Sequence, residues 1–353
     1  MTTPREYQEA LEARLLSPLA AKSAEAVRER PEEPCTIRPA YQRDRDRILY
    51  SKPFRRLKHK TQVFIAPLGD HYTTRLTHTL AVAQVSRTVA RALRLNEDLT
   101  EAIGLGHDIG HAPFGHAGET ALTRIFPDHF RHNEQSRRIV EVLEHDGRGL
   151  NLTYAVREGI YLHSKARRDI MTTAWGTAST LEGQIIKLCD SVAYINHDID
   201  DAMRAGVLRQ EDLPAEVLGV LGASHGERID TMVSDLIGFN WWATGEGQPP
   251  DPPLIGMSPT ILAATNQLRD FMYREVYLHE RAKADDSKVR FVVETLYAHF
   301  VRHPEQIPAD LMAINQARQE PVERAVVDYI AGMTDRYALE RFKQLFIPRT
   351  WGA

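Results

Sequence analysis

The segment GHDIGHAPFGHAGE, residues 106–119, concentrates side chains that can bind metal or transfer protons, with three histidines and two carboxylates. His107 and Asp108 are adjacent, and both can face one cation if the chain turns there, as Gly110 and Pro113 indicate. Imidazole and carboxylate ligands together suit divalent ions, and the absence of nearby cysteine argues against a structural zinc site. Because a His-Asp pair also occurs by chance in many chains, a metal site needs further ligands from elsewhere.

His78 and Asp190 are the candidates for those ligands. His78 lies on the apolar face of an expected helix at 74–94, and Asp190 interrupts an apolar helical stretch within 181–204. A buried carboxylate costs several kcal/mol unless it is paired or bound to metal. Taken singly, His78 could be a hydrogen-bonded core histidine and Asp190 one half of a buried salt bridge. Together with His107 and Asp108, they predict a four-ligand metal site.

Proton transfer has its own candidates. His116 and Glu119 are three residues apart, so the carboxylate could orient the imidazole and raise its basicity, or the two could simply stabilise a turn. Tyr194 and Asp198 follow Asp190 at helical spacing and share roughly its face. Ordinary core packing for Tyr194 and a solvated charge for Asp198 are the alternatives.

The elements that must position these residues are helices. Glycine and proline cluster at breaks, no repeat is evident, and the polar stretch 163–180 and the Pro/Gly-rich stretch 245–259 are predicted loops. The basic run at 55–60 could be a solvated helix face or could supply a cation for phosphate. The expected helices lie at 5–17, 41–58, 74–94, 99–108, 133–145, 181–204, 260–284, 286–302, 308–317 and 320–344.

Length and composition indicate a globular protein with a large core. The chain has 353 residues, is 42% hydrophobic and carries a formal charge of -4, so general attraction to nucleic acid is not implied. Cys35 and Cys189 cannot form a disulfide framework, the N-terminus lacks the apolar core of a secretory signal, and no apolar run reaches membrane-spanning length. These features predict a cytoplasmic protein with no membrane association.

Several segments together resemble the deoxyguanosine triphosphate triphosphohydrolases of the HD superfamily, in particular the shorter bacterial dGTPase-like branch. The resemblance covers about residues 36–350, and nothing corresponds to the sterile-alpha-motif domain of the animal relatives. It implies a mostly α fold, an HD-domain helical bundle with a helical C-terminal lobe. The implied division is an N-terminal helix and irregular segment (1–40), an HD phosphohydrolase core (41–210) and a C-terminal lobe (211–353) packed as one unit. The segments that carry the resemblance are 41–64, 75–84, 106–119, HNEQS at 132–136, the Asp190 helix, 228–237 and 268–277.

The resemblance implies a role for each matching residue. The metal ligands would be His78, His107, Asp108 and Asp190. The catalytic residues would be His116, Glu119 and His132. The substrate contacts would be Gln62, Arg75, Tyr194, Asp198, Arg269 and Tyr277. Ser191 departs from the animal branch, which has a phosphate-binding lysine there, so the number of cationic phosphate contacts is open.

The implied reaction cleaves a dNTP at the α-phosphate to a deoxynucleoside and inorganic triphosphate. Mn²⁺ or Mg²⁺ is the favoured metal, and Fe²⁺, Co²⁺, Ni²⁺ or Zn²⁺ are compatible with the ligands. Relatives form dimer-based hexamers, some with a dNTP effector, so a homo-oligomer is expected, with an effector and single-stranded DNA as further candidate partners. The alternatives are an HD phosphohydrolase for (p)ppGpp, a cyclic dinucleotide or a monophosphate, and a regulatory protein that binds nucleotide or single-stranded DNA. The preferred base and the direction of proton transfer by His116 are open.

Overall fold

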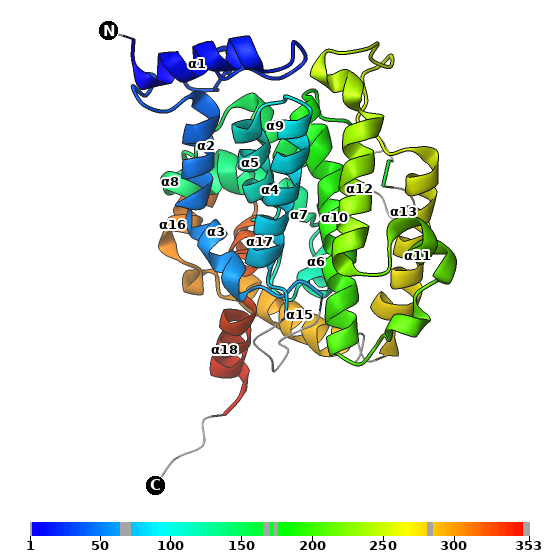
Figure 1. Cartoon of the computed structure of the whole chain (residues 1–353). Helices are drawn as coiled ribbons and strands as arrows, with labels where there is room; N and C mark the ends of the chain where they lie inside the picture. Colours follow the sequence, from blue (N-terminus) through cyan, green and yellow to red (C-terminus); the bar gives the residue numbers. More distant parts are fainter. Residues whose placement is uncertain (1, 64–71, 165–169, 172–175, 281–284, 349–353) are drawn as a thin grey trace.

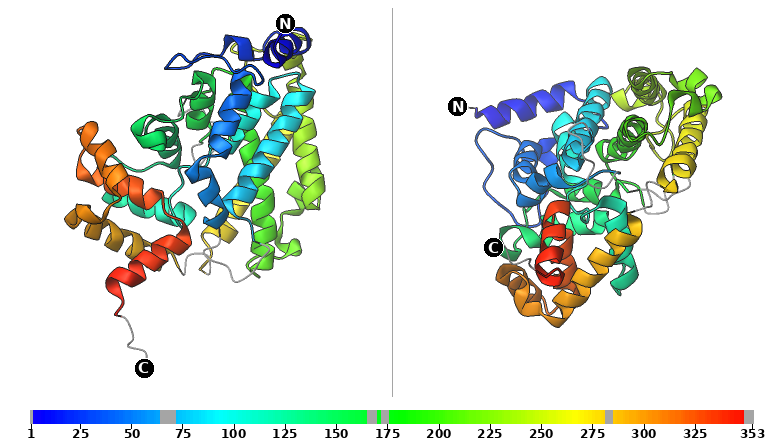
Figure 2. Two further views of the ribbon diagram at one scale, coloured as in Figure 1. Left: turned by 90° about the vertical axis from the view of Figure 1, so that its left-hand side faces the viewer. Right: turned by 90° about the horizontal axis from the view of Figure 1, so that it is seen from below.

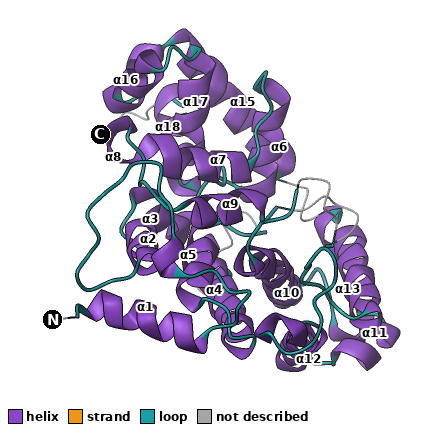
Figure 3. Cartoon of the chain, turned by 90° about the horizontal axis from the view of Figure 1, so that it is seen from above, coloured by secondary structure: helices purple, strands orange, loops and turns teal. Residues whose placement is uncertain are grey.

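The computed structural model describes residues 2–63, 72–164, 170–171, 176–280 and 285–348. Within these ranges the regular elements are helices, and the extended backbone forms only two isolated bridges, Arg28–Thr153 and Thr61–Thr74. Figure 3 shows helices packed on helices without a sheet. The predicted mostly α fold is confirmed. Among the described helices, none combines the length and apolarity needed to cross a bilayer.

Helix α10 (Leu181–Arg204) is the centre of the fold. Thr180 begins it by accepting a hydrogen bond from the Gly183 amide, and apolar residues on several of its faces are buried. It packs against α4 (Arg75–Ala92), α5 (Glu97–Gly106) and α9 (Tyr154–Leu162), and on its other side against α12 (His225–Phe239) and α13 (Pro259–Met272). Figure 1 shows α10 (green) running between α4 and α12. The predicted helix 181–204 is therefore confirmed, as is the helix expected at 74–94.

The remaining helices cover this centre. Helix α1 (Pro4–Leu15) lies across one end of the body, with no buried residue (Figure 1). Figure 2 shows the orange and red helices of the last part of the chain gathered on one side of the body. There α15 (Asp286–Arg302) and α17 (Val322–Ala331) share a hydrophobic cluster with α6 (Gly115–Ile125). The others are α2 (Ala40–Leu49), α3 (Lys52–Arg56), α7 (His132–Arg138), α8 (Glu144–Gly147), α11 (Ala215–Leu221), α16 (Ala309–Ala317) and α18 (Asp335–Phe346).

Two long predicted helices were wrong as single elements. The stretch 41–58 breaks after α2, because Ser51 accepts a hydrogen bond from the Phe54 amide and starts α3. The stretch 320–344 breaks between α17 and α18, where Thr334 caps the second helix. Helices α6, α9, α11 and α12 were not predicted. Parts of two other predictions, residues 165–169 and 172–175 of the loop and 281–284 of the helix, lie outside the described residues.

Buried polar contacts join the last part of the chain to the segment around residue 60. The Lys60 ammonium is buried and donates to the carbonyl oxygens of His111 and Ala331, and burial lowers its pKa to about 7. The Asp335 carboxylate accepts hydrogen bonds from the backbone and hydroxyl of Thr61 (3.0 and 2.7 Å) and from the Phe114 amide (2.8 Å). The loop after Asp108 is thus held from the C-terminal side.

Glu182, in the first turn of α10, gives the fold a predictable pH dependence. Its buried carboxylate accepts hydrogen bonds from the amides of Ala21 (3.1 Å) and Asn96 (2.9 Å), and burial raises its pKa from 4.5 to about 7. The folded protein therefore holds a proton that the unfolded chain releases between these values. This group should lower the free energy of unfolding by about 3 kcal/mol as the pH rises through that window.

The Glu182→Gln variant keeps the acceptor oxygen and cannot ionise. Denaturant unfolding between pH 4.5 and 8 is expected to show that wild type loses more stability with rising pH than this variant does. Glu211→Gln, at an exposed carboxylate, is the matched control and should follow wild type. Equal pH dependence in wild type and Glu182→Gln would contradict the prediction.

Candidate active site

The four predicted metal ligands converge in the structure. His78 lies on α4, His107 ends α5, Asp108 follows it and Asp190 lies on α10. His78 Nε2 is 3.2 Å from Asp190 Oδ1 and 3.8 Å from Asp108 Oδ2. His107 Nε2 is 3.5 Å from Asp108 Oδ1 and 3.9 Å from Asp190 Oδ1. Two imidazole nitrogens and two carboxylates, from α4, α10 and the turn that follows α5, therefore surround one point.

These residues fit a divalent cation. His107 Nδ1 lies 2.7 Å from the Gly104 carbonyl oxygen, so this nitrogen donates and Nε2 carries the lone pair. That Nε2 atom is buried, and no hydrogen-bond partner for it lies among the described residues. The ligand atoms of His78, His107 and Asp108 all lie within 4.8 Å of one another. A divalent metal ion held between these residues would satisfy the buried imidazole nitrogen.

The charges around this cluster keep its members in the protonation states that ligands need. Burial alone would raise the pKa of Asp108, but the neighbouring imidazoles of His111 and His107 and the Arg75 guanidinium outweigh it and hold that pKa well below its usual range. Burial lowers the pKa of His78. Asp108 is thus an anion and His78 a neutral imidazole at neutral pH, as metal binding requires.

A second cluster lies around Glu119, on α6. Its Oε1 atom accepts a hydrogen bond from the His132 backbone amide (2.8 Å) and lies 3.0 Å from His132 Nδ1. Burial would raise the pKa of Glu119, but His132 opposes this and the pKa lies well below the usual range. His132 shows the reverse balance: burial lowers its pKa, the Glu119 charge raises it, and the net shift is upward. The His111 ring stacks on the His132 ring at 4.0 Å between centroids. Glu119 and His132 therefore lie beside the turn at residues 107–110, called the HD turn below.

His116 differs from its predicted arrangement. Its Nδ1 atom is 3.6 Å from Glu119 Oε2, beyond hydrogen-bond distance, and its side chain is 76% exposed. Glu119 points inward from α6 toward the start of α7, so His132 takes the close contact that spacing assigned to His116. The structure brings all three predicted catalytic residues together, with His132 as the nearer partner of the carboxylate.

The predicted substrate contacts fall into two groups. Arg75 donates from Nη1 to Asp108 Oδ2 (2.8 Å), while its buried Nε and Nη2 atoms and the buried Gln62 Oε1 atom have no hydrogen-bond partner among the described residues. Arg75 Nη2 lies against Gly115, where a Cβ atom would approach it to 2.9 Å. The second group is on α10, on α13 and on the π-helical turn Tyr273–Tyr277 that follows α13. The Tyr277 hydroxyl donates to Asp198 Oδ2 (2.5 Å). Tyr194 and Arg269 belong to this group, because burial raises the pKa of Tyr194 and the nearby Arg269 charge opposes that shift.

Curated relatives match almost the whole chain. A protein of Caldanaerobacter subterraneus subsp. tengcongensis is 54% identical over 98% of this chain and 97% of its own. Proteins of Desulfatibacillum aliphaticivorans and Clostridium perfringens are each 46% identical over 98% of this chain, covering 99% and 98% of their own lengths. All three are named deoxyguanosinetriphosphate triphosphohydrolase-like proteins. This chain belongs to that family.

Family models agree with this assignment. The HD domain model matches residues 75–195, which contain all four candidate ligands, and a phosphohydrolase-associated domain matches 255–344. The dGTPase-like chain is therefore an HD-domain phosphohydrolase. Its cluster of histidine and aspartate residues can hold a divalent metal.

Several site residues of this dGTPase-like protein were missed in the sequence. His111 lies inside the motif, but nothing in the spacing gave it a partner. His163 Nδ1 donates to the Ile160 carbonyl oxygen (2.6 Å), and its Nε2 lies 3.2 Å from His132 Nε2. Burial lowers the pKa of His163 to about 3. His197 lies 2.8 Å from His78 Nδ1 through its Nε2 atom. In the sequence, only its position directly before the candidate Asp198 could have indicated that His197 belongs to the site.

Lys60, the buried basic residue of the run 55–60, is not available to contact a phosphate. Its ammonium donates hydrogen bonds to the carbonyl oxygens of His111 and Ala331. Lys60 therefore stabilises the loop after Asp108 and does not face an anion.

Hydrogen bonds join the turn after Asp108 to α7. Ser136 Oγ accepts from the Gly110 amide (2.9 Å) and donates to the His107 carbonyl oxygen (2.8 Å). A Cβ atom on Gly110 would lie 2.2 Å from the Ser136 nitrogen, so only glycine permits this approach. The HD turn and the helix that begins at His132 are therefore fixed to each other.

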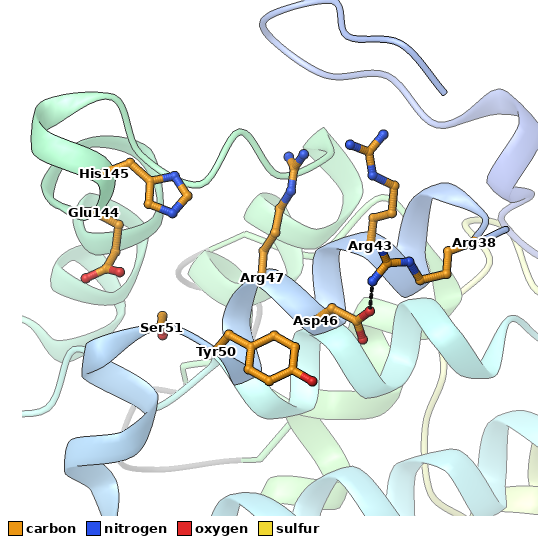
Figure 4. Close-up of a pocket in the computed structure, with 8 residues that line it drawn as sticks. All are labelled: Arg38, Arg43, Asp46, Arg47, Tyr50, Ser51, Glu144 and His145. Carbon is orange, nitrogen blue, oxygen red and sulfur yellow. Dashed lines mark hydrogen bonds and ion pairs between the residues drawn. The ribbon is translucent and has the colours of Figure 1, made fainter. Parts of the chain in front are cut away.

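A separate surface hollow of about 310 Å³ lies beside α2 (Figure 4). Its arginines already have acidic partners: Arg38 contacts Asp46 (2.5 Å), and Arg43 and Arg47 contact Glu32 (3.3 and 2.6 Å). Each of these arginines therefore already contacts a carboxylate, and none of the candidate catalytic residues lines the hollow. Its lining consists of Arg38, Arg43, Asp46, Arg47, Tyr50, Ser51, Glu144 and His145.

Proposed function

We propose that this protein is a metal-dependent dNTP triphosphohydrolase, which cleaves dGTP or another dNTP to a deoxynucleoside and inorganic triphosphate. The observation that carries the proposal is the convergence of His78, His107, Asp108 and Asp190 beside the partly unsatisfied guanidinium of Arg75. A cation site next to a buried arginine with free N–H groups suits a polyphosphate. The names of the relatives, which specify dGTP triphosphohydrolase-like proteins, supply the nucleotide.

The metal, with Mn²⁺ or Mg²⁺ favoured, would supply Lewis-acid activation of the phosphate and of water. Arg75 is held in place by Asp108 and can direct Nε and Nη2 to phosphate oxygens. His132 keeps a raised pKa beside Glu119 and so adds positive charge where the phosphates would lie. His116 is exposed next to this pair and can exchange a proton with the attacking water or the leaving 5'-oxygen.

The resemblance also predicts two further ligands, a dNTP effector and single-stranded DNA. It predicts in addition a dimer-based hexamer and a cytoplasmic location. The oligomeric state can be measured directly by light scattering with and without dNTP.

The test is product chromatography after incubation of the full chain with Mn²⁺ and each of the four dNTPs, with the matching ribonucleotides alongside. Inorganic triphosphate together with the deoxynucleoside is the expected product pair. Pyrophosphate or a nucleoside monophosphate as product would contradict the proposal and favour another HD phosphohydrolase reaction. Binding of dNTP without turnover in the presence of Mn²⁺ would favour a regulatory nucleotide-binding protein.

A further inference from the structure

The Nδ1 atom of His78, which does not face the metal site, contacts a second histidine, His197. His78 Nε2 faces the carboxylates of Asp190 and Asp108, while Nδ1, on the opposite side of the ring, lies 2.8 Å from His197 Nε2. The two rings meet nearly at right angles, with centroids 5.0 Å apart. His197 lies on α10, the helix that also carries Asp190, so one helix contacts both edges of the His78 ring.

A carboxylate lies beside His197 on the same helix. Its Nδ1 atom lies 2.8 Å from Asp198 Oδ1. The other carboxylate oxygen, Asp198 Oδ2, accepts a hydrogen bond from the Tyr277 hydroxyl (2.5 Å), and Asp198 is buried. Tyr277 ends the π-helical turn Tyr273–Tyr277 that follows α13. A line of polar contacts thus runs from α4 through α10 to the segment after α13.

The chemistry of a ligating histidine fixes the direction of these contacts. When Nε2 of a neutral imidazole binds a cation, the proton is on Nδ1, so His78 donates to His197 Nε2. His197 then carries its own proton on Nδ1, which lies 2.8 Å from Asp198 Oδ1 in a charge contact without hydrogen-bond geometry. Metal-binding histidines usually donate their second N–H to a carboxylate, a carbonyl or water, and this contact sets ring orientation, tautomer and ligand basicity. Here an imidazole backed by a carboxylate occupies that position.

We propose that His197 is a positioning residue for the metal site: it fixes the orientation and tautomer of His78, with Asp198 as its anchor. The inference rests on the proposed metal-dependent function. It also gives Asp198 and Tyr277 a role that does not require contact with substrate. His197 reaches the cation only through His78, so its effect is on metal affinity before any chemistry.

The experiment measures the dissociation constant of Mn²⁺ alone, by electron paramagnetic resonance of free Mn²⁺, on the full chain without nucleotide. His197→Leu removes the acceptor and should weaken binding by about 10- to 100-fold. His197→Gln places an amide oxygen near the former Nε2 position and should bind within about threefold of wild type. His197→Asn has the same amide on a side chain that is one methylene shorter, so its oxygen does not reach His78 and binding should weaken as in His197→Leu.

His225→Leu is the matched control, because this partly exposed histidine of α12 pairs with Asp200 of α10 (2.9 Å), away from His78. It should bind Mn²⁺ as wild type does. The Gln and Asn variants keep the test decisive if the Leu variant does not fold, as judged by thermal unfolding without metal. Unchanged Mn²⁺ affinity in folded Leu or Asn variants would overturn the positioning role and leave the metal site standing. Failure of wild type to bind Mn²⁺ would overturn the metal site itself.

Discussion

The Asp108→Ala variant is expected to lose at least about 10³-fold in kcat. Asp108 faces both histidine ligands and accepts a hydrogen bond from Arg75. Its removal deletes one anionic metal ligand and frees the arginine that we expect to hold phosphate. Charge stabilisation by a bound metal contributes several kcal/mol to a phosphoryl-transfer barrier, and each 1.36 kcal/mol is a factor of about ten in rate.

Steady-state turnover of dGTP at saturating Mn²⁺, together with the bound Mn²⁺ content, checks this result. Asp200→Ala is the matched control, because Asp200 is partly exposed on α10 and pairs with His225. It should retain wild-type turnover and metal content. Near-normal turnover of Asp108→Ala with metal still bound would show that another group holds the cation.

Glu119→Gln is expected to lower kcat by about 10²- to 10⁴-fold, the range that general acid–base groups contribute. The Glu119 carboxylate contacts the His132 backbone and ring, and its charge raises the pKa of His132. His111 Nε2 and His116 Nδ1 lie 4.0 and 3.6 Å from the same carboxylate. Glutamine keeps one acceptor but loses the charge, so all three imidazoles lose the anion beside them.

Parallel measurements on His116→Ala and His132→Ala assign the proton transfer. A large loss in His116→Ala with KM unchanged would identify the exposed imidazole as the group that exchanges the proton. Glu134→Gln, at an exposed carboxylate in the first turn of α7, is the control and should behave as wild type. Wild-type turnover in Glu119→Gln would rule out a catalytic role for the cluster.

Much of the metal site could be predicted because its information is local. His78 and Asp190 each interrupt an apolar helical face, and α10 has a clear start at Thr180, so periodicity alone oriented both residues inward. Periodicity failed at 41–58 for an equally local reason: the cap at Ser51 restarts the helix without disturbing the polar pattern on either side.

The supporting residues could not be predicted, because their roles arise from contacts between distant segments. His197 meets His78 across 119 residues of chain, and His163 meets His132 across 31. Glu119 has His116 on its own helix, yet it pairs with His132, because the packing of α6 against the start of α7 decides which imidazole is near. Sequence spacing describes one helix at a time and does not contain that packing.

Lys60 has a consequence for how the chain can be divided. Its ammonium, in apolar surroundings, shares two carbonyl acceptors, one beside the HD turn and one near the end of α17. A fragment that ended before α17 would lack Ala331, so the Lys60 ammonium would lose one of its two carbonyl acceptors. It would also lack Asp335, which accepts a hydrogen bond from the Phe114 amide. Helix α17 and the start of α18 therefore support the loop after Asp108, and we expect an HD segment expressed without them to be less stable.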